Sequence, residues 1–170
     1  MEKQEILNKK LLTVAVTATK TKEIKELLDQ GAEINCKNEW GFNPIMLAAQ
    51  YNPSVLVLKA LIAEGANFKE TEPEFKSSVL HLASLGSTNA KVVEILLASG
   101  CNIDERNYLG ETPLMLAVNA NPLTKISTAL IKAGADVNAK DYNGHSVLTF
   151  AISSKRNYLI KALKETGAVN

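Results

Sequence analysis

The sequence predicts an all-helical solenoid, in which pairs of short antiparallel helices stack side by side and are joined by loop fingers. Two observations lead to this prediction. A glycine that follows an apolar run recurs every 33 to 35 residues, and similar phrases flank the apolar runs in most of these units. The recurring glycines are Gly31, Gly65, Gly100, Gly134 and Gly167.

The fourth unit is the clearest. Thr112 and Pro113 open its first helix, because threonine caps a helix N-terminus and proline in the first turn has no N–H to leave unsatisfied. Asn121-Pro122 then interrupts the apolar run, which predicts two short helices in place of one long helix. Gly134 suits the left-handed residue that ends a helix, and residues 141–144 are typical of a tight turn.

This pattern resembles the ankyrin repeat family from roughly Ile6 to Asn170. The resemblance rests on the glycine phrases, of which Gly134-Ala-Asp-Val-Asn138 is one, and on opening phrases such as Gly110-Glu-Thr-Pro-Leu-Met-Leu-Ala117. It implies an all-α ankyrin-repeat solenoid of stacked helix-turn-helix units with β-hairpin or loop fingers. We expect one domain over residues 1–170, with five repeats at about 6–40, 41–75, 76–109, 110–143 and 144–170.

The terminal repeats are atypical. In the first repeat, residues 11–16 predict the first helix, residues 24–28 predict the second, and the charged residues between Glu2 and Lys10 precede both. Such polarity suits an N-terminal cap, which has one face in water. The last repeat is polar enough to form a C-terminal cap, through Lys155, Arg156, Asn157, Lys161 and Lys164.

The second and third repeats also depart from the pattern. In the second, Asn43 replaces threonine as the helix cap and Asn52-Pro53 separates the helices. The third repeat opens at Lys76 without glycine or proline, after a loop over residues 69–75 that is one residue longer than its counterparts. This loop is either a specialised contact for a basic partner or an irregular solvated loop whose turn no longer needs glycine, and we favour the second interpretation.

The composition argues against several classes of function. Nineteen Lys and Arg oppose 18 Asp and Glu, so the net charge of +1 would not steer the chain to nucleic acid or to an anionic membrane. The N-terminal residues lack the apolar stretch of a signal peptide, and no run approaches the ~18 apolar residues of a membrane span. We therefore expect a monomeric cytoplasmic protein that binds neither nucleic acid nor membrane, although delivery into another cell would suit the same sequence.

The sequence offers little for catalysis. It contains no nucleotide-binding glycine motif and no His/Cys set with the spacing of metal ligands, so we expect no catalytic residue, metal or cofactor. His81 matches a family histidine whose role is structural hydrogen bonding between adjacent repeats. His145 follows Gly144 and has no serine or cysteine nucleophile beside it in the sequence. Cys36 and Cys101 lie two repeats apart, which predicts small buried thiols without a disulfide.

The resemblance implies that partners bind the finger tips and the concave face of the first helices. Carried over position by position, it assigns a binding surface in each of four repeats. This surface comprises Glu39, Trp40, Phe42, Gln50 and Tyr51 in the second repeat, Glu74, Phe75, Ser77 and Leu85 in the third, Tyr108, Leu109, Glu111 and Asn119 in the fourth, and Tyr142, Asn143, His145 and Ser153 in the fifth. The extra residue makes the assignment in the third repeat the least constrained.

Aromatic residues are concentrated on this surface. Six of the nine in the chain belong to it: Trp40, Phe42, Tyr51, Phe75, Tyr108 and Tyr142. Aromatic side chains are enriched among interface hot spots. They either form a binding stripe or pack along neighbouring fingers and stiffen the array.

We expect a non-enzymatic protein–protein interaction module that binds a protein partner. The alternatives are a structural or self-assembling scaffold and, behind it, an enzyme built around His145.

Overall fold

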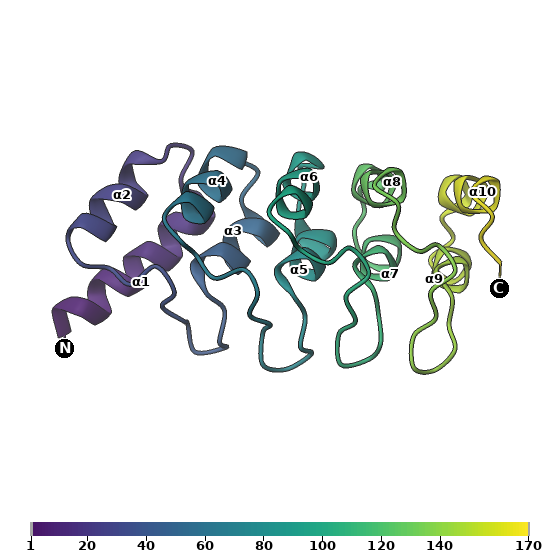
Figure 1. Cartoon of the computed structure of the whole chain (residues 1–170), viewed down its shortest axis with the longest axis horizontal. Helices are drawn as coiled ribbons and strands as arrows, with labels where there is room; N and C mark the ends of the chain where they lie inside the picture. Colours follow the sequence, from purple (N-terminus) through teal and green to yellow (C-terminus); the bar gives the residue numbers. More distant parts are fainter. Residues whose placement is uncertain (1, 170) are drawn as a thin grey trace.

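The computed structural model describes residues 2–169 and shows one elongated stack of helix pairs with the chain ends at opposite extremities (Figure 1). Met1 and Asn170, the final residue of the last glycine phrase, lie outside the described residues. The first helices of the pairs form one layer, made of α1 (Glu2–Thr17), α3 (Pro44–Tyr51), α5 (Val79–Gly86), α7 (Pro113–Asn119) and α9 (Val147–Ser153). The second helices form the other layer, made of α2 (Lys22–Asp29), α4 (Val55–Ala63), α6 (Lys91–Ala98), α8 (Thr124–Lys132) and α10 (Asn157–Glu165).

The all-α fold class is confirmed. Residues 2–169 contain no β-strand, and the hairpin character of the fingers is reduced to isolated bridges between Thr71 and Ser78 and between Lys140 and Ser146. The core lies between the two layers, where each helix buries an apolar face that it could not bury alone. Its largest fully buried side chains are Leu11, Ile24, Ile45, Met46, Leu58, Leu61, Leu80, Leu96, Leu114, Met115, Ile126 and Leu130.

The helix ends follow the sequence signals. The hydroxyl of Thr112 accepts a hydrogen bond from the Met115 N–H, and the Asn43 side chain accepts one from the Met46 N–H at 3.1 Å. The interruption at Asn121-Pro122 separates α7 from α8, as predicted. The five recurring glycines all have φ between +83° and +104°, a region that costs other L-residues roughly 1–2 kcal/mol. Glycine is therefore needed wherever a second helix turns back toward a finger.

The prediction for the start of the chain was wrong. The charged residues before Leu11 do not precede the first helix but belong to α1, which begins at Glu2 and runs for 16 residues. Nothing between Glu2 and Thr17 stops a helix, and Lys9 supports it through an ion pair with Glu5 at 2.7 Å, one turn earlier. The extended N-terminal part of α1 reaches the loop after α2, where Gln4 donates a hydrogen bond to the Gly31 carbonyl at 2.7 Å.

Buried asparagines join neighbouring repeats at the turns between helices. The Asn121 side chain donates to the carbonyls of Ser84 and Ser87 at 3.0 and 3.1 Å and accepts from the Leu123 N–H at 2.9 Å. In the second repeat, Asn52 makes the equivalent bonds to the carbonyls of Ala15 and Ala18. These carbonyls lie near the end of the preceding first helix, where no intrahelical donor remains. Each asparagine therefore supplies donors that the repeat before it lacks.

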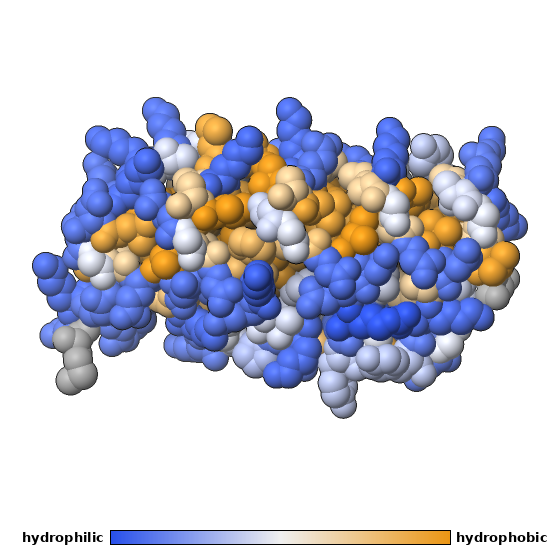
Figure 2. Space-filling model, viewed as in Figure 1, coloured by the Kyte–Doolittle hydropathy of each residue, from blue (hydrophilic) through white to orange (hydrophobic). Residues whose placement is uncertain are grey.

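The two long edges of the stack are polar. Figure 2 shows hydrophilic side chains over the second helices at the top and over the fingers at the bottom, with an apolar band between them. No helix among residues 2–169 is long and apolar enough to cross a membrane.

Replacing Asn121 with alanine should destabilise the protein strongly. The change removes three hydrogen bonds and leaves two carbonyls near a buried position without their donor, so we expect a loss of about 2–4 kcal/mol. Urea unfolding followed by circular dichroism measures it. Asn143→Ala is the matched control, because Asn143 is exposed at a finger tip and should change stability by less than about 0.5 kcal/mol. Equal losses in the two variants would contradict the role assigned to Asn121.

Candidate functional site

Four fingers, each preceding a first helix, carry most of the residues predicted for the binding surface. We define them as the first finger (residues 38–42), the second (72–77), the third (107–111) and the fourth (141–145). Each loop is closed by a backbone hydrogen bond of 3.0 Å from the N–H of its first residue to the carbonyl of its last. The fingers hang in a row below the first helices (Figure 1).

One side-chain oxygen at the start of each finger organises the loop. Asn107 accepts hydrogen bonds from the N–H groups of Leu109 and Glu111, both at 2.9 Å. Asn38 and Asp141 accept the equivalent pairs in the first and fourth fingers. Because this polar group turns inward, the residues that follow it are presented outward.

The second finger keeps this design with a different residue. Glu72 is buried, and its carboxylate accepts from the N–H groups of Glu74, Phe75 and Ser77 at 2.8 to 2.9 Å. The side chain is one methylene longer than asparagine or aspartate, which matches the one-residue extension of the loop. Lys76 takes the left-handed conformation, with φ of +56°, where the other fingers have glycine. The turn thus forms without glycine, as expected, but it keeps the left-handed position of the other fingers and fills it with lysine.

Lys76→Gly should stabilise the protein by about 0.5–1 kcal/mol. Glycine removes the left-handed penalty of lysine, and this gain exceeds the extra entropy that glycine brings to the unfolded chain. The shift in the urea midpoint measures it. Lys69→Gly is the control, because Lys69 has negative φ and the same substitution there should be neutral or destabilising. A destabilised Lys76→Gly variant would contradict the assigned backbone strain.

The fourth finger brings together a histidine and a carboxylate, the two groups that an enzyme built around His145 would need. His145 Nδ1 lies 3.0 Å from the second carboxylate oxygen of Asp141, and the imidazole makes an edge contact with Phe150. In the third finger, Asn107 donates to the Glu111 carboxylate at 3.0 Å from the same pair of positions. Because an amide and a carboxylate make the same link in that finger, we interpret the Asp141–His145 pair as a brace of the loop.

The environment lowers the pKa of Asp141. Burial alone would raise it, but hydrogen bonds from the His145 ring and from the N–H groups of His145 and Asn143 outweigh that effect. A carboxyl whose pKa is lower in the folded state stabilises the fold above its unfolded pKa of about 3.9, and this stabilisation is lost as the pH falls through the folded pKa.

Asp141→Asn should therefore change how stability depends on pH. The amide retains an oxygen for the two loop N–H groups, as Asn107 does, but carries no charge to titrate. We expect the variant to be less stable than the wild type at pH 6, with the difference shrinking below about pH 4. Thermal unfolding across this range measures it. A difference that grows on acidification would contradict the lowered pKa.

His81 links the third and fourth repeats, as the resemblance implies. Its Nδ1 accepts from the Ser78 N–H at 3.2 Å, which leaves Nε2–H to donate to the Glu111 carbonyl at 3.0 Å. Burial lowers the pKa of His81, so the neutral ring that this geometry requires is favoured. His81 thus joins α5 to the base of the third finger.

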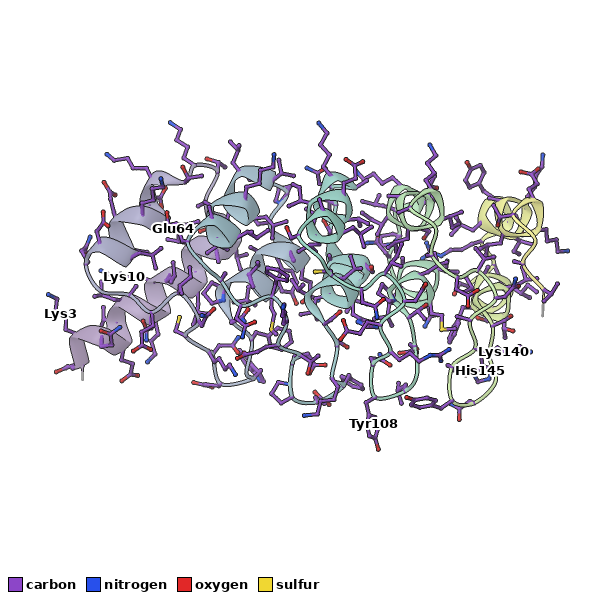
Figure 3. The ribbon with its side chains drawn as sticks, viewed as in Figure 1. Lys3, Lys10, Glu64, Tyr108, Lys140 and His145 are labelled. Atoms are coloured by element: carbon purple, nitrogen blue, oxygen red, sulfur yellow. The ribbon has the colours of Figure 1, made fainter. Side chains whose placement is uncertain are left out.

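Five of the six surface aromatics are exposed, and Phe42 is half-buried. The most exposed are Trp40, Tyr108 and Tyr142, at 71%, 68% and 71%. Figure 3 shows Tyr108 projecting from the tip of the third finger and His145 in the fourth. The other residues predicted for this surface divide by burial. Glu39, Glu74, Leu109, Asn119, Asn143, His145 and Ser153 are exposed, Leu85 and Glu111 are half-buried, and Gln50 and Ser77 are buried.

The two buried residues have clear reasons for their position. Ser77 follows the extra residue of the second finger, so its N–H turns inward to Glu72. Gln50 lies under Gly86, where an added Cβ would approach the Gln50 side chain to 2.6 Å and its carbonyl oxygen to 2.8 Å. The close approach of α3 and α5 therefore covers Gln50. Neither side chain forms part of the surface of this structure.

Contacts between fingers connect the row. The N–H of Tyr108 donates to the Phe75 carbonyl at 2.6 Å, and that of Tyr142 donates to the Leu109 carbonyl at 3.0 Å. The Tyr142 ring also lies against Gly110, where an added Cβ would come within 2.7 Å of it. The second, third and fourth fingers are thus bonded to one another. Tyr142 therefore suits both interpretations of the aromatic residues. Its ring packs on a neighbouring finger, and most of its side chain is nevertheless exposed to a partner.

The potential metal ligands and the two cysteines are dispersed among residues 2–169. Among residues 2–169, no three His, Cys, Asp or Glu side chains cluster to hold a metal ion. Cys36 is buried and Cys101 is half-buried, neither forms a disulfide, and burial raises the pKa of both thiols to about 11. Both cysteines are therefore protonated at neutral pH and poor nucleophiles.

Sequence reasoning missed two groups of residues. The inward role of Asn38, Glu72 and Asn107 was not recognised, although an Asn or Asp three residues before glycine recurs in three fingers and signals it. It also missed exposed apolar side chains outside the fingers, for which the sequence carries no recurring signal. These are Ile6, Leu56, Ile152, Tyr158 and Val169.

Comparison with known proteins agrees with this architecture. A family model for ankyrin repeats, in three copies, matches residues 12–107 and 80–170. A putative ankyrin repeat protein of Fowlpox virus is 32% identical over 100 residues, which is 57% of this chain and 17% of that protein. A second, from Acanthamoeba polyphaga mimivirus, is 39% identical over 84 residues, covering 48% of this chain and 11% of that protein.

A third relative carries the name of an enzyme. An L-asparaginase of Dirofilaria immitis is 28% identical over 109 residues, which is 64% of this chain and 18% of that protein. The similarity thus spans less than a fifth of the length of each of these three relatives.

Proposed function

Because this chain belongs to the ankyrin repeat family, we propose that it works as a monomeric, non-enzymatic interaction module that binds a protein partner through its finger tips and the adjoining face of its first helices. Ankyrin repeats are generally protein–protein interaction modules and generally not enzymes. The observation that carries the proposal for this chain is the row of exposed aromatic side chains, above all Trp40, Tyr108 and Tyr142, on fingers whose backbones are already bonded in place.

The mechanism is preorganisation. Each finger is closed by its own backbone bond and by the inward oxygen of Asn38, Glu72, Asn107 or Asp141. Little loop entropy is then lost when a partner binds, and aromatic side chains bury a large area while few rotamers are restricted. Truncating one such aromatic side chain would weaken the binding of a partner that covers it by ~2 kcal/mol or more.

Affinity capture tests this function. The bait is the full chain, used against lysate of its native cell and compared with a Trp40→Ala/Tyr108→Ala/Tyr142→Ala variant. We expect a partner that the wild type retains and the triple variant loses, with an affinity at least tenfold weaker when the purified pair is titrated.

The matched control removes exposed apolar side chains away from the fingers. Leu56→Ala/Tyr158→Ala changes α4 and α10, at 57% and 65% exposure, and should leave capture unchanged. Because Tyr142 rests on Gly110, melting temperatures must show that the triple variant is folded. Equal loss in both variants, or a partner retained by the triple variant, would refute binding through the fingers. A mass that rises with protein concentration would favour self-assembly.

A further inference from the structure

The first finger differs from the others in what lies on either side of it. The third and fourth fingers bond to the finger before them through the N–H groups of Tyr108 and Tyr142. The equivalent residue of the first finger is Glu39, and among residues 2–169 no finger comes before it. The equivalent residue of the second finger is Pro73, which has no N–H to give to the Trp40 carbonyl. Pro73 packs against Gly41 instead. The first finger therefore lacks the tip-to-tip hydrogen bonds that join the other three.

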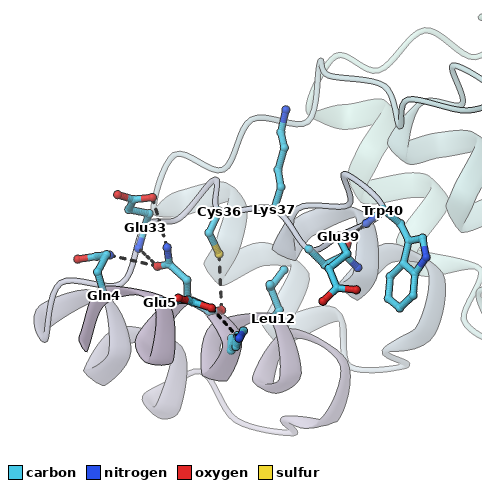
Figure 4. A pocket seen from close by; sticks show the side chains of 11 residues that line it. Gln4, Glu5, Leu12, Glu33, Cys36, Lys37, Glu39 and Trp40 are labelled. Atoms are coloured by element: carbon cyan, nitrogen blue, oxygen red, sulfur yellow. Dashed lines mark hydrogen bonds and ion pairs between the residues drawn. The ribbon is translucent and has the colours of Figure 1, made fainter. Parts of the chain in front are cut away.

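Two grooves flank this finger as a result. The first groove, of about 870 Å³, separates it from the N-terminal half of α1 and is bounded by Leu12, Cys36 and Trp40. The second groove, of about 580 Å³, separates it from Pro73 and Glu74 of the second finger. Trp40 lines both and forms the ridge between them. In Figure 4, Trp40 and Glu39 lie next to each other, across the first groove from Gln4 and Glu5 of α1.

The charge of these grooves opposes that of the whole chain. Five glutamates (Glu5, Glu33, Glu39, Glu72 and Glu74) and two lysines (Lys9 and Lys37) line them, a net charge of −3 in a chain of net charge +1. Both lysines are already engaged, Lys9 with Glu5 at 2.7 Å and Lys37 with Glu70 at 3.0 Å. Glu72 is turned inward to its own loop. Glu39 and Glu74 remain exposed, and both line the second groove together with Trp40.

We propose that the grooves around Trp40 bind an extended, arginine- or lysine-bearing segment of a protein partner, with a cationic side chain stacked on the Trp40 ring near Glu39 and Glu74. An indole ring attracts a cation over its face, and two exposed carboxylates complement the same charge. An extended segment suits the site because it can lie in the first groove, between the first finger and the N-terminal half of α1. This inference rests on the proposed function and adds the chemistry of the partner.

The single tryptophan of the chain reports directly on this site. The probe is a peptide of about nine residues that alternates arginine and serine and spans roughly 30 Å when extended. Titrated into the full chain at low ionic strength, it should change the emission of Trp40 and saturate. The same peptide with glutamate in place of arginine should leave the emission unchanged. Emission that does not respond to the arginine peptide would overturn the inference.

Two variants with matched controls separate the site from general charge attraction. Binding of the fluorescein-labelled arginine peptide should weaken about tenfold in Trp40→Ala and about tenfold in Glu39→Gln/Glu74→Gln. Tyr158→Ala removes an equally exposed aromatic residue from α10, and Glu23→Gln/Glu94→Gln removes two exposed carboxylates from α2 and α6. Both controls should bind within about twofold of wild type. Equal weakening in the variants and their controls would overturn the inference.

The outcome is distinguishable from a failure of the proposed function. A captured partner that depends on Trp40, Tyr108 and Tyr142 but not on Glu39 and Glu74 would leave the interaction module standing and overturn the cationic segment. Capture lost in the Glu39→Gln/Glu74→Gln variant, together with emission that responds to the arginine peptide, would support both. A mass that rises with concentration in wild type but not in Trp40→Ala would assign the grooves to a second copy of the chain and overturn the inference.

Discussion

The conformation of the finger surface depends on the hydrogen bonds that a side-chain oxygen at the start of each finger accepts from the backbone N–H groups of the same loop. A tight loop points several backbone N–H groups toward its own centre, and those groups need an acceptor when water is excluded. Asparagine, aspartate and, in the longer loop, glutamate all supply one. The loop N–H groups require an oxygen acceptor within hydrogen-bond distance, and more than one residue type supplies it. The longer second finger accordingly uses the longer side chain of glutamate. With this bond made, the residues at the finger tips are exposed.

Buried polar side chains also satisfy backbone carbonyls between neighbouring repeats. Asn52 and Asn121 satisfy carbonyls of the repeat before them, and His81 satisfies one of the repeat after it. A repeat cannot meet these requirements alone, because the missing partner is always on its neighbour. Stability and the position of the third finger are therefore connected, since His81 joins α5 to the last residue of that finger.

The sequence predicted the structural features that recur in each repeat, but not those that depend on contacts between repeats or on the N-terminal segment. Recurring glycines and Asn-Pro pairs carry their structural meaning locally, so the helix ends followed directly from them. The N-terminal part of α1 has no repeat to compare with, and its charged residues were taken for a segment outside the helix. Lys76 occupies a left-handed position that residue type alone argues against. The burial of Gln50 depends on how closely Gly86 lets α5 approach, which no pattern within one repeat encodes.

Trp40 and Tyr142 differ in how their binding and structural roles are coupled. The Tyr142 ring packs on Gly110 and its N–H is bonded to the third finger, so a change there alters the row as well as any contact with a partner. The backbone of Trp40 is bonded within its own finger, and its ring stands between two grooves. In the proposed function, the free energy that Trp40 would contribute to binding is therefore largely separate from the free energy of folding. Specificity can change most readily at such a position, because the stack does not depend on the side chain that occupies it.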